Sequence, residues 1–120
     1  MITGNLPFRQ TLSFDDVLLA PKYSEIETRS EIDLSSNISS HNFDLPIISS
    51  PMDTLTEEAM AVSMSLYGGL GVVHRYNTIS EQAAIVRKIN SLTEKVSAAV
   101  GVTGRFVERA IATHSEGAKI

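Results

Sequence analysis

Three stretches of the sequence place polar side chains directly after short apolar runs, which is where α/β enzymes carry their binding and catalytic groups. They are LPIISSPMDT at residues 45–54, GGLGVVHR at residues 68–75 and SAAVG at residues 97–101. The hydroxyl of Ser50 can hydrogen-bond a ribose or a phosphate, and the soft thioether of Met52 can lie against a flat purine ring. The alternative is structural: Ser50 satisfies a turn and Met52 fills the core.

His74 and Arg75 follow the second apolar run. An arginine at a strand end can bind a phosphate through two hydrogen bonds or stack on an aromatic ring, although an exposed strand-end cation is the alternative. Asp53 and Thr54 fit a different role, because carboxylate and hydroxyl side chains satisfy the free amides at a helix N-terminus. We therefore expect Asp53 and Thr54 to cap the following helix.

The remaining polar groups show no catalytic or metal-binding pattern in the sequence. His41, His74 and His114 lack the spacing of metal ligands, and no carboxylate accompanies them at helical offsets, so we predict no transition metal. Asp15 and Asp16 are adjacent rather than facing, which favours a turn or a cap over an acid–base pair. There is no cysteine, which excludes disulfides and thiol chemistry within these residues.

The composition is that of an ordinary globular chain. It has 120 residues, 42% of them apolar, and a formal net charge of −4, which suits one domain or part of one. The acidic balance and scattered basic residues do not favour a nucleic-acid partner. No apolar run approaches the roughly 20 residues of a membrane span, and the amino terminus lacks a signal-peptide pattern, so we expect a cytoplasmic protein.

Strand-like apolar runs begin near Leu45, Leu70 and Val96. Their interval of about 25 residues fits successive βα units, because parallel strands need a helical crossover between them. Lys119 looks like the beginning of a fourth strand. Residues 1–44 are expected to form an irregular lead-in with one or two short strands, and the Ser/Asn-rich part at 35–42 to mark turns.

Three helices are predicted from the spacing of apolar residues, at about 55–67, 80–90 and 104–116. Thr54 and Thr78 each begin a candidate capping box, and Thr103 is the expected cap of the third helix. Gly68 and Gly117 are expected to end the first and third helices. The residues expected on the three inner faces are Leu55, Ala59, Val62 and Leu66; Ile79, Ala83, Val86 and Ile89; and Phe106, Ala110, Ile111 and His114.

The predicted fold class is α/β, with residues 45–120 supplying the first three βα units of a (β/α)8 TIM barrel. Such a barrel needs roughly 250 residues, so about half or more would lie outside this chain. The alternative is an open α/β sheet of three or four strands, which would need its own cover for the sheet edge.

Four motifs carry a family resemblance: FDDVLL at 14–19, PIISSPMDT at 46–54, GGLGVVHR at 68–75 and SAAVG at 97–101. In this order and spacing, the chain closely resembles the inosine monophosphate dehydrogenase/GMP reductase family over nearly its whole length. Each motif alone is weak, but four in register are specific.

The resemblance implies a TIM barrel that binds a purine nucleotide, IMP or GMP, and a nicotinamide cofactor at the carboxyl ends of its strands. In the family, a cysteine on a later loop attacks the purine C2 atom. The dehydrogenase then passes hydride to NAD and yields XMP, whereas the reductase uses NADPH to convert GMP to IMP. The resemblance also implies a homotetramer and allows a monovalent cation in the complete enzyme.

The resemblance assigns individual residues to the two ligands. Ser50 and Met52 correspond to the nucleotide site, and His74 and Arg75 to the cofactor side. Thr28 and Arg29 match a reductase segment that reaches the cofactor, with a solvated loop as the alternative. No catalytic residue is expected, because the chain lacks the cysteine and should be inactive alone.

The branch of the family is indicated by mixed features. Typical dehydrogenases insert a pair of CBS modules between the second helix and the third strand, but here residues 88–95 connect that helix and strand directly. The lack of an insert and the segment TRSEIDL at 28–34 are both similar to the reductases. SSPMDT at 49–54 and SAAVG at 97–101 look more like the dehydrogenases. We favour IMP dehydrogenase, with GMP reductase as the alternative and a non-catalytic nucleotide-binding or assembly fragment as a reading of another class.

Overall fold

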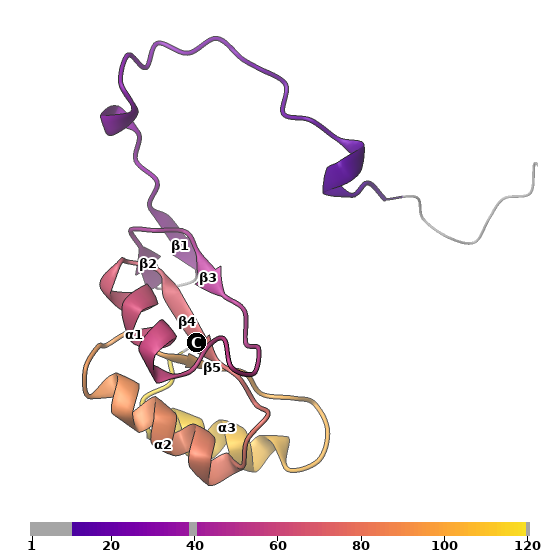
Figure 1. Cartoon of the computed structure of the whole chain (residues 1–120), viewed down its shortest axis with the longest axis vertical. Coiled ribbons are helices and arrows are strands. Elements are labelled where there is room, and N and C mark those ends of the chain that lie inside the picture. Colours follow the sequence, from indigo (N-terminus) through magenta and orange to yellow (C-terminus); the bar gives the residue numbers. More distant parts are fainter. Residues whose placement is uncertain (1–10, 39–40, 120) are drawn as a thin grey trace, which may run out of the picture. The chain divides into compact units, whose positions relative to one another are not determined.

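The computed structural model describes residues 11–38 and 41–119, which divide into two units after Ile32. The described residues of the first unit form two short 3-10 helices, η1 (Phe14–Asp16) and η2 (Arg29–Glu31), joined by extended chain (Figure 1). Each unit is treated separately below.

Both 3-10 helices begin with a hydroxyl residue that bonds an acidic residue three positions later. Ser13 donates its amide (2.8 Å) and its hydroxyl (2.9 Å) to the Asp16 carboxylate, and these bonds lower the pKa of Asp16. Thr28 donates its hydroxyl to Glu31 in the same way, at 3.0 Å. The prediction that Asp16 serves a turn or cap is confirmed.

The second unit contains a hairpin and a three-stranded parallel sheet. The strands are β1 (Ser36–Ile38), β2 (His41–Phe43), β3 (Ile48–Ser49), β4 (Leu70–Val73) and β5 (Ser97–Ala98). β1 and β2 pair antiparallel, and the sheet has the order β3-β4-β5 with all strands parallel. Two short strands in the lead-in are therefore confirmed. They occupy the 35–42 run predicted as turns, because the buried Phe43 draws its strand into pairing with β1.

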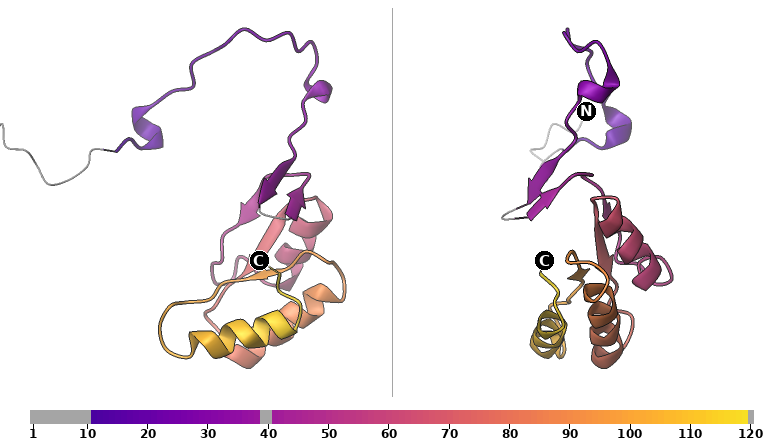
Figure 2. Two further views of the ribbon diagram at one scale, coloured as in Figure 1. Left: turned by 180° about the vertical axis from the view of Figure 1, so that it is seen from behind. Right: turned by 90° about the vertical axis from the view of Figure 1, so that its left-hand side faces the viewer.

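One helix follows each strand of the parallel sheet. The helices are α1 (Glu58–Leu66), α2 (Ile79–Asn90) and α3 (Phe106–Ser115). The described part of the chain is thus an α/β structure of parallel βαβ units, as predicted. Figure 2 shows α2 and α3 running side by side below the strands. No helix of residues 11–38 and 41–119 is long and apolar enough to span a membrane.

The predicted start of the first helix is wrong. α1 begins at Glu58 with Glu57 as its N-cap residue, and no side chain caps it, so the Thr54 capping box does not form. Thr54 instead has a φ of +60° and belongs to the loop. The predicted end is confirmed: Tyr67 is the C-cap and Gly68 has a φ of +84°, a conformation that favours glycine.

The predicted inner face of α1 is only partly confirmed: Val62 packs against the core, but Leu55, Ala59 and Leu66 are exposed. Ala61 is the buried residue of this helix, while Leu66 is 74% exposed. The reason lies in β4, where an added methyl group at Gly71 would come within 2.4 Å of the Ala61 Cα. Helix and strand are close enough that only small residues fit between them, so α1 turns its small residue inward.

α2 matches its prediction closely. Thr78 accepts the Glu81 amide at 3.2 Å, and its own amide and hydroxyl donate to the Glu81 carboxylate at 2.8 and 2.7 Å. Hydrogen bonds from the Thr78 hydroxyl and amide lower the pKa of Glu81, so its carboxylate stays charged at a lower pH than that of an ordinary glutamate. Ala83, Val86 and Ile89 are buried as predicted.

Replacing Thr78 with alanine should therefore lower the free energy of unfolding by about 1 kcal/mol, because one hydroxyl satisfies an orphan amide and orders Glu81. Urea unfolding followed by circular dichroism measures the loss. The control is Ser115→Ala, which removes a hydroxyl that bonds the Ile111 carbonyl within α3, away from the capping box, and should change stability little. Equal losses in both variants would contradict the capping role.

α3 departs from its prediction at two points. Arg105, not Thr103, is the N-cap residue, and no side chain caps the helix. Thr113 is the buried residue, whereas Ile111, expected inside, is 62% exposed. α3 turns this face toward α2 because Arg109, one turn before Thr113, donates a hydrogen bond to Gln82 of α2. The predicted stop is confirmed by Gly117, whose φ is +109°.

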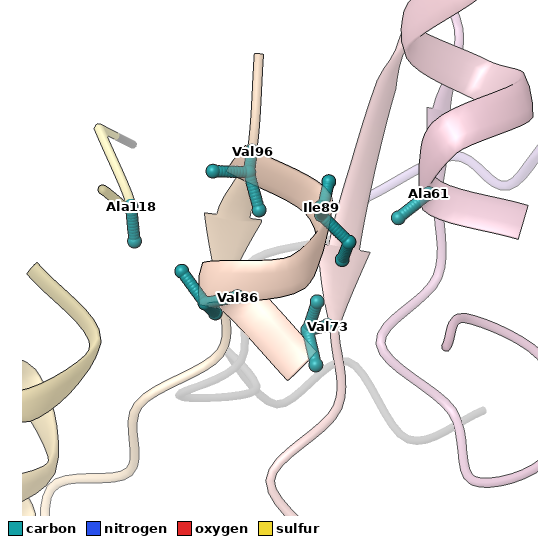
Figure 3. Packing of buried hydrophobic residues seen from close by; sticks show 6 residues of the cluster. All are labelled: Ala61, Val73, Val86, Ile89, Val96 and Ala118. Carbon is teal, nitrogen blue, oxygen red and sulfur yellow. The ribbon is translucent and has the colours of Figure 1, made fainter. Parts of the chain in front are cut away.

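The core of the second unit lies where the helices meet β4. Side chains from α1, β4, α2, the residue before β5 and the segment after α3 converge there (Figure 3); they are Ala61, Val73, Val86, Ile89, Val96 and Ala118. The Lys119 amide donates to the Val96 carbonyl at 3.1 Å, so the chain after α3 returns alongside β5, where a fourth strand is predicted.

Candidate functional site

The loop between β3 and α1 is held rigid by a buried threonine. Thr56 is fully buried, and its hydroxyl donates to the Ser50 carbonyl at 2.6 Å and lies 3.0 Å from the Ser49 hydroxyl. The Leu55 and Thr56 amides both donate to the Met52 carbonyl at 3.2 Å. The backbone of the loop is thereby fixed while the side chains of Ser50 and Met52 face solvent, Met52 with 58% exposure.

The same loop contains the only described residue other than glycine with a positive φ, Thr54. This region is unfavourable for a β-branched side chain and is found most often at functional sites. The turn directs Asp53 toward β4, where its Oδ1 lies 3.8 Å from Nε2 of His74. The prediction that Asp53 and Thr54 cap α1 is therefore wrong, because hydrogen bonds of the loop outcompete the local cap.

His74 is buried at the carboxyl end of β4, with only 3% of its surface exposed. Its Nδ1 accepts the Tyr76 amide at 3.1 Å, so the proton of the neutral ring lies on Nε2. The Tyr76 ring stacks on it with centroids 6.1 Å apart. Nε2 faces Oε1 of Glu57 at 3.5 Å and makes no hydrogen bond with any residue that the structure describes.

Asp53, Glu57 and His74 therefore form one cluster, with ligand-type atoms all within 4.8 Å of one another. The two carboxylates are exposed and the imidazole is buried. The sequence offers no carboxylate near His74, but the parallel pairing of β3 and β4 brings both acids to it. The prediction of no transition metal considered only carboxylates at helical offsets from the histidines, whereas this cluster joins residues that are distant in the sequence.

Arg75 extends over the loop that follows β5. An added methyl group at Gly101 would come within 2.5 Å of its Nη1, so the absence of a side chain at Gly101 leaves room for the guanidinium. Arg75, Arg105 and Arg109 line a cavity of about 110 Å³ at the start of α3. Within the described residues, Arg75 makes no hydrogen bond or ion pair, so its guanidinium is available for an anion.

A buried glutamine ties the strand ends together. Gln82 is fully buried, and its Nε2 donates to the Ala99 carbonyl at 3.0 Å and to the Val73 carbonyl at 3.3 Å. Its Oε1 accepts from Nη1 of Arg109 at 2.7 Å, and Nη2 of Arg109 donates to the Asn77 carbonyl at 3.0 Å. This network connects β4, β5, α2 and α3 directly behind the loops that carry the candidate residues.

The structure brings some of the predicted site residues together and not others. Ser50 and Met52 follow β3, and His74 and Arg75 follow its parallel neighbour β4, so all four lie at the same edge of the sheet. Thr28 and Arg29 belong to the first unit, as the cap and first residue of η2.

Three residues of the site were not found from the sequence: Glu57, Gln82 and Arg109. Glu57 stands at the third position after Thr54, where the sequence predicts the acidic half of a capping box, and its distance from His74 along the chain conceals their contact. A glutamine on the inner face of an otherwise apolar helix is the signal that could have revealed Gln82, because a buried amide needs hydrogen-bond partners.

The geometry can now be compared with known proteins. The domain family described as "IMP dehydrogenase / GMP reductase domain" matches residues 11–120, which is nearly the whole chain. The chain belongs to the IMP dehydrogenase/GMP reductase family. The resemblance given by the four sequence motifs is thereby confirmed.

Relatives of this family member include both enzyme types. The inosine-5'-monophosphate dehydrogenase of Nitrosopumilus maritimus is 48% identical over 85 residues, covering 70% of this chain and 18% of that protein. The GMP reductase of Leishmania donovani is 41% identical over 88 residues, covering 72% of this chain and 18% of that protein. The chain therefore spans about a fifth of the length of these relatives.

A solved structure of the family shows the same partial match. The inosine 5' monophosphate dehydrogenase of Legionella pneumophila superimposes with a TM-score of 0.78 and 37% identity, over 91% of this chain and 33% of that chain. The parallel βαβ units of this IMP dehydrogenase/GMP reductase family member thus correspond to part of a TIM-barrel protein.

Proposed function

We propose that this chain is the amino-terminal part of an NAD(P)-dependent purine nucleotide oxidoreductase, most closely an IMP dehydrogenase that converts IMP to XMP. The observation that carries the proposal is the β3–α1 loop, in which a fixed backbone presents Ser50 and Met52 to solvent at the carboxyl end of a parallel strand. This is the edge at which α/β barrels bind their ligands. Family membership supplies the ligand class.

In this proposal the loop forms a shelf for the purine nucleotide. The Met52 thioether lies against the flat base, and the Ser50 hydroxyl bonds the ribose or phosphate. Hydride chemistry is supplied by NAD, or by NADPH in the reductase alternative, and the cysteine nucleophile comes from outside these residues.

The cofactor side of the site is assigned to Arg75, and the resemblance to the reductases assigns Thr28 and Arg29 to the cofactor of a neighbouring subunit. The unpaired Arg75 guanidinium suits a phosphate or an aromatic ring. His74 is buried, so we assign it to holding Tyr76 and the β4 loop in place rather than to direct contact with cofactor. The complete enzyme is proposed to be a cytoplasmic homotetramer.

Two chimaeras test the proposal. In one, residues 11–120 replace the matching segment of the Legionella pneumophila dehydrogenase; in the other, they replace that of the Leishmania donovani GMP reductase. We expect the first to oxidise IMP with NAD, and to retain a larger share of its parent's activity than the second retains with GMP and NADPH. The proposed function would be refuted if both chimaeras folded but were inactive. If the reductase chimaera retained the larger share of its parent's activity, GMP reductase would replace IMP dehydrogenase as the favoured branch.

Ser50→Ala in the active chimaera should raise the KM for the nucleotide about tenfold with a smaller change in kcat, because one hydrogen bond to a bound ligand is lost. Steady-state kinetics at saturating cofactor measure both constants. Ser115→Ala is the matched control, since its hydroxyl bonds only the Ile111 carbonyl on α3. An unchanged KM in Ser50→Ala would remove Ser50 from the site.

The absence of cysteine favours one second candidate, a chain that binds a nucleotide or assembles with a partner without chemistry. A thermal-shift titration of the 120-residue chain with IMP and GMP, together with its native mass, tests this role. A monomer whose unfolding temperature does not respond to either nucleotide would count against it.

A further inference from the structure

The carboxyl ends of β3 and β4 and the N-terminus of α1 place three ligand-type side chains around one point. His74 Nε2 lies 3.8 Å from Oδ1 of Asp53 and 3.5 Å from Oε1 of Glu57. We propose that this Asp53–Glu57–His74 cluster binds a divalent first-row transition cation such as Zn²⁺ or Mn²⁺. The cluster shares the β3–α1 loop with the nucleotide shelf but uses neither Ser50 nor Met52, and it does not depend on the proposed function.

The distances fit such an ion. Zinc bonds of about 2.0–2.2 Å to nitrogen and oxygen put neighbouring ligand atoms roughly 3.0–3.5 Å apart. The separation of Nε2 from Glu57 is at the top of this range and that from Asp53 exceeds it by about 0.3 Å, while all three ligand atoms lie within 4.8 Å of one another. Both carboxylates are on exposed side chains that can close on an ion by rotating, while the imidazole is held in place by burial.

A second observation points to a ligand. Among the described residues, two buried side-chain polar atoms make no hydrogen bond, Nε2 of His74 and Oδ1 of Asn77. Buried polar atoms are nearly always paired, so each needs an explanation. Both residues line the same open cavity of about 470 Å³, which also contains Asp53 and Glu57.

The charge of this cavity favours a cation. Three carboxylates line it, those of Asp53, Glu57 and Glu81, and no lysine or arginine does. Glu81 is occupied by the Thr78 cap, which leaves the other two for an ion. One imidazole with two carboxylates is a donor set for zinc, manganese or iron, whereas Mg²⁺ and Ca²⁺ prefer oxygen alone.

Binding has one structural cost. Because Nδ1 of His74 accepts the Tyr76 amide, the ring proton is on Nε2, and an ion at Nε2 requires it to move to Nδ1. The hydrogen bond to Tyr76 is then lost. Losing one such bond lowers affinity by about tenfold, which is small beside the gain from three ligands. We expect the segment around Tyr76 to shift when the ion binds.

Calorimetric titration of the 120-residue chain with Zn²⁺ and with Mn²⁺ tests the site. We expect one site per chain whose affinity falls at least a hundredfold in the Asp53→Asn, Glu57→Gln double variant. Both replaced side chains are exposed, so the variant should keep its fold, which circular dichroism verifies. Glu58→Gln is the control, because Glu58 pairs with Lys88 at 2.6 Å and does not join the cluster.

Broadening of amide NMR signals by Mn²⁺ provides an independent location for the ion. Loss of signal centred on residues 53–57 and 74–77 supports the site. Broadening centred on His41 or His114, equal affinities in wild type and double variant, or no binding of either metal would each overturn the proposal.

Discussion

Replacing Gly71 with alanine is expected to destabilise the second unit by about 3 kcal/mol, the upper end of the usual cost of overpacking a core. The added methyl group would lie 2.4 Å from the Ala61 Cα and 2.6 Å from its Cβ. Because backbone rather than a flexible side chain blocks it, α1 must move away from β4. Urea unfolding of the 120-residue chain, followed by circular dichroism, measures the loss.

Gly104→Ala is the matched control for this substitution. An added methyl group there meets no atom within 4 Å, and the cost is limited to the φ of +64°, or about 1 kcal/mol. A movement of α1 would also displace Glu58 and the loop that precedes it. If Gly71→Ala proved no more costly than Gly104→Ala, the close contact between α1 and β4 would be wrong.

The elements with strong local signals could be predicted from the sequence. α2 has a complete capping box at Thr78 and an apolar face of Ala83, Val86 and Ile89, and both are present in the structure. Gly68 and Gly117 end their helices with positive φ. In each case the interaction spans four residues or fewer, or repeats with the helical period, so the sequence alone contains it.

The start of α1 could not be predicted, because two interactions compete for the same residues. Thr54 and Glu57 fit a capping box, but the buried Thr56 hydroxyl donates to the Ser50 carbonyl and stabilises a turn in place of the helix start. The apolar spacing that favoured Leu66 as an inner residue was overridden by the contact between Ala61 and Gly71. Both outcomes depend on β3 and β4, which lie beyond the local sequence.

The candidate site divides in the same way. Its positions at strand ends, Ser50, Met52 and Arg75, follow from the βα rhythm. The contacts that assemble the site do not follow from this rhythm. Asp53 and His74 are 21 positions apart in the sequence, and Gln82 and Arg109 are 27 positions apart. Pairs at such separations become visible only when the order of the parallel strands is known.

Gln82→Leu is expected to cost about 3 kcal/mol and to loosen the candidate site. The leucine fills the space but leaves the Ala99 carbonyl without its donor and the Arg109 guanidinium without its acceptor. A buried group deprived of its partner costs about 1–3 kcal/mol, and more when it is charged. The Val73 carbonyl is less affected, because the Ala99 amide still donates to it at 2.9 Å.

A double-mutant cycle with Arg109→Met separates this network from simple loss of packing. Removing either partner alone leaves the facing group of the other, Nη1 of Arg109 or Oε1 of Gln82, without its hydrogen bond, so each single variant includes that penalty. The double variant removes both groups, and its cost should fall short of the sum by at least 1 kcal/mol. In the chimaera, Gln82→Leu should also raise the KM for the cofactor, since the loops after β4 and β5 are both anchored by this side chain. Additive costs with an unchanged KM would show that the glutamine only fills space, and that the strand ends are positioned by the core alone.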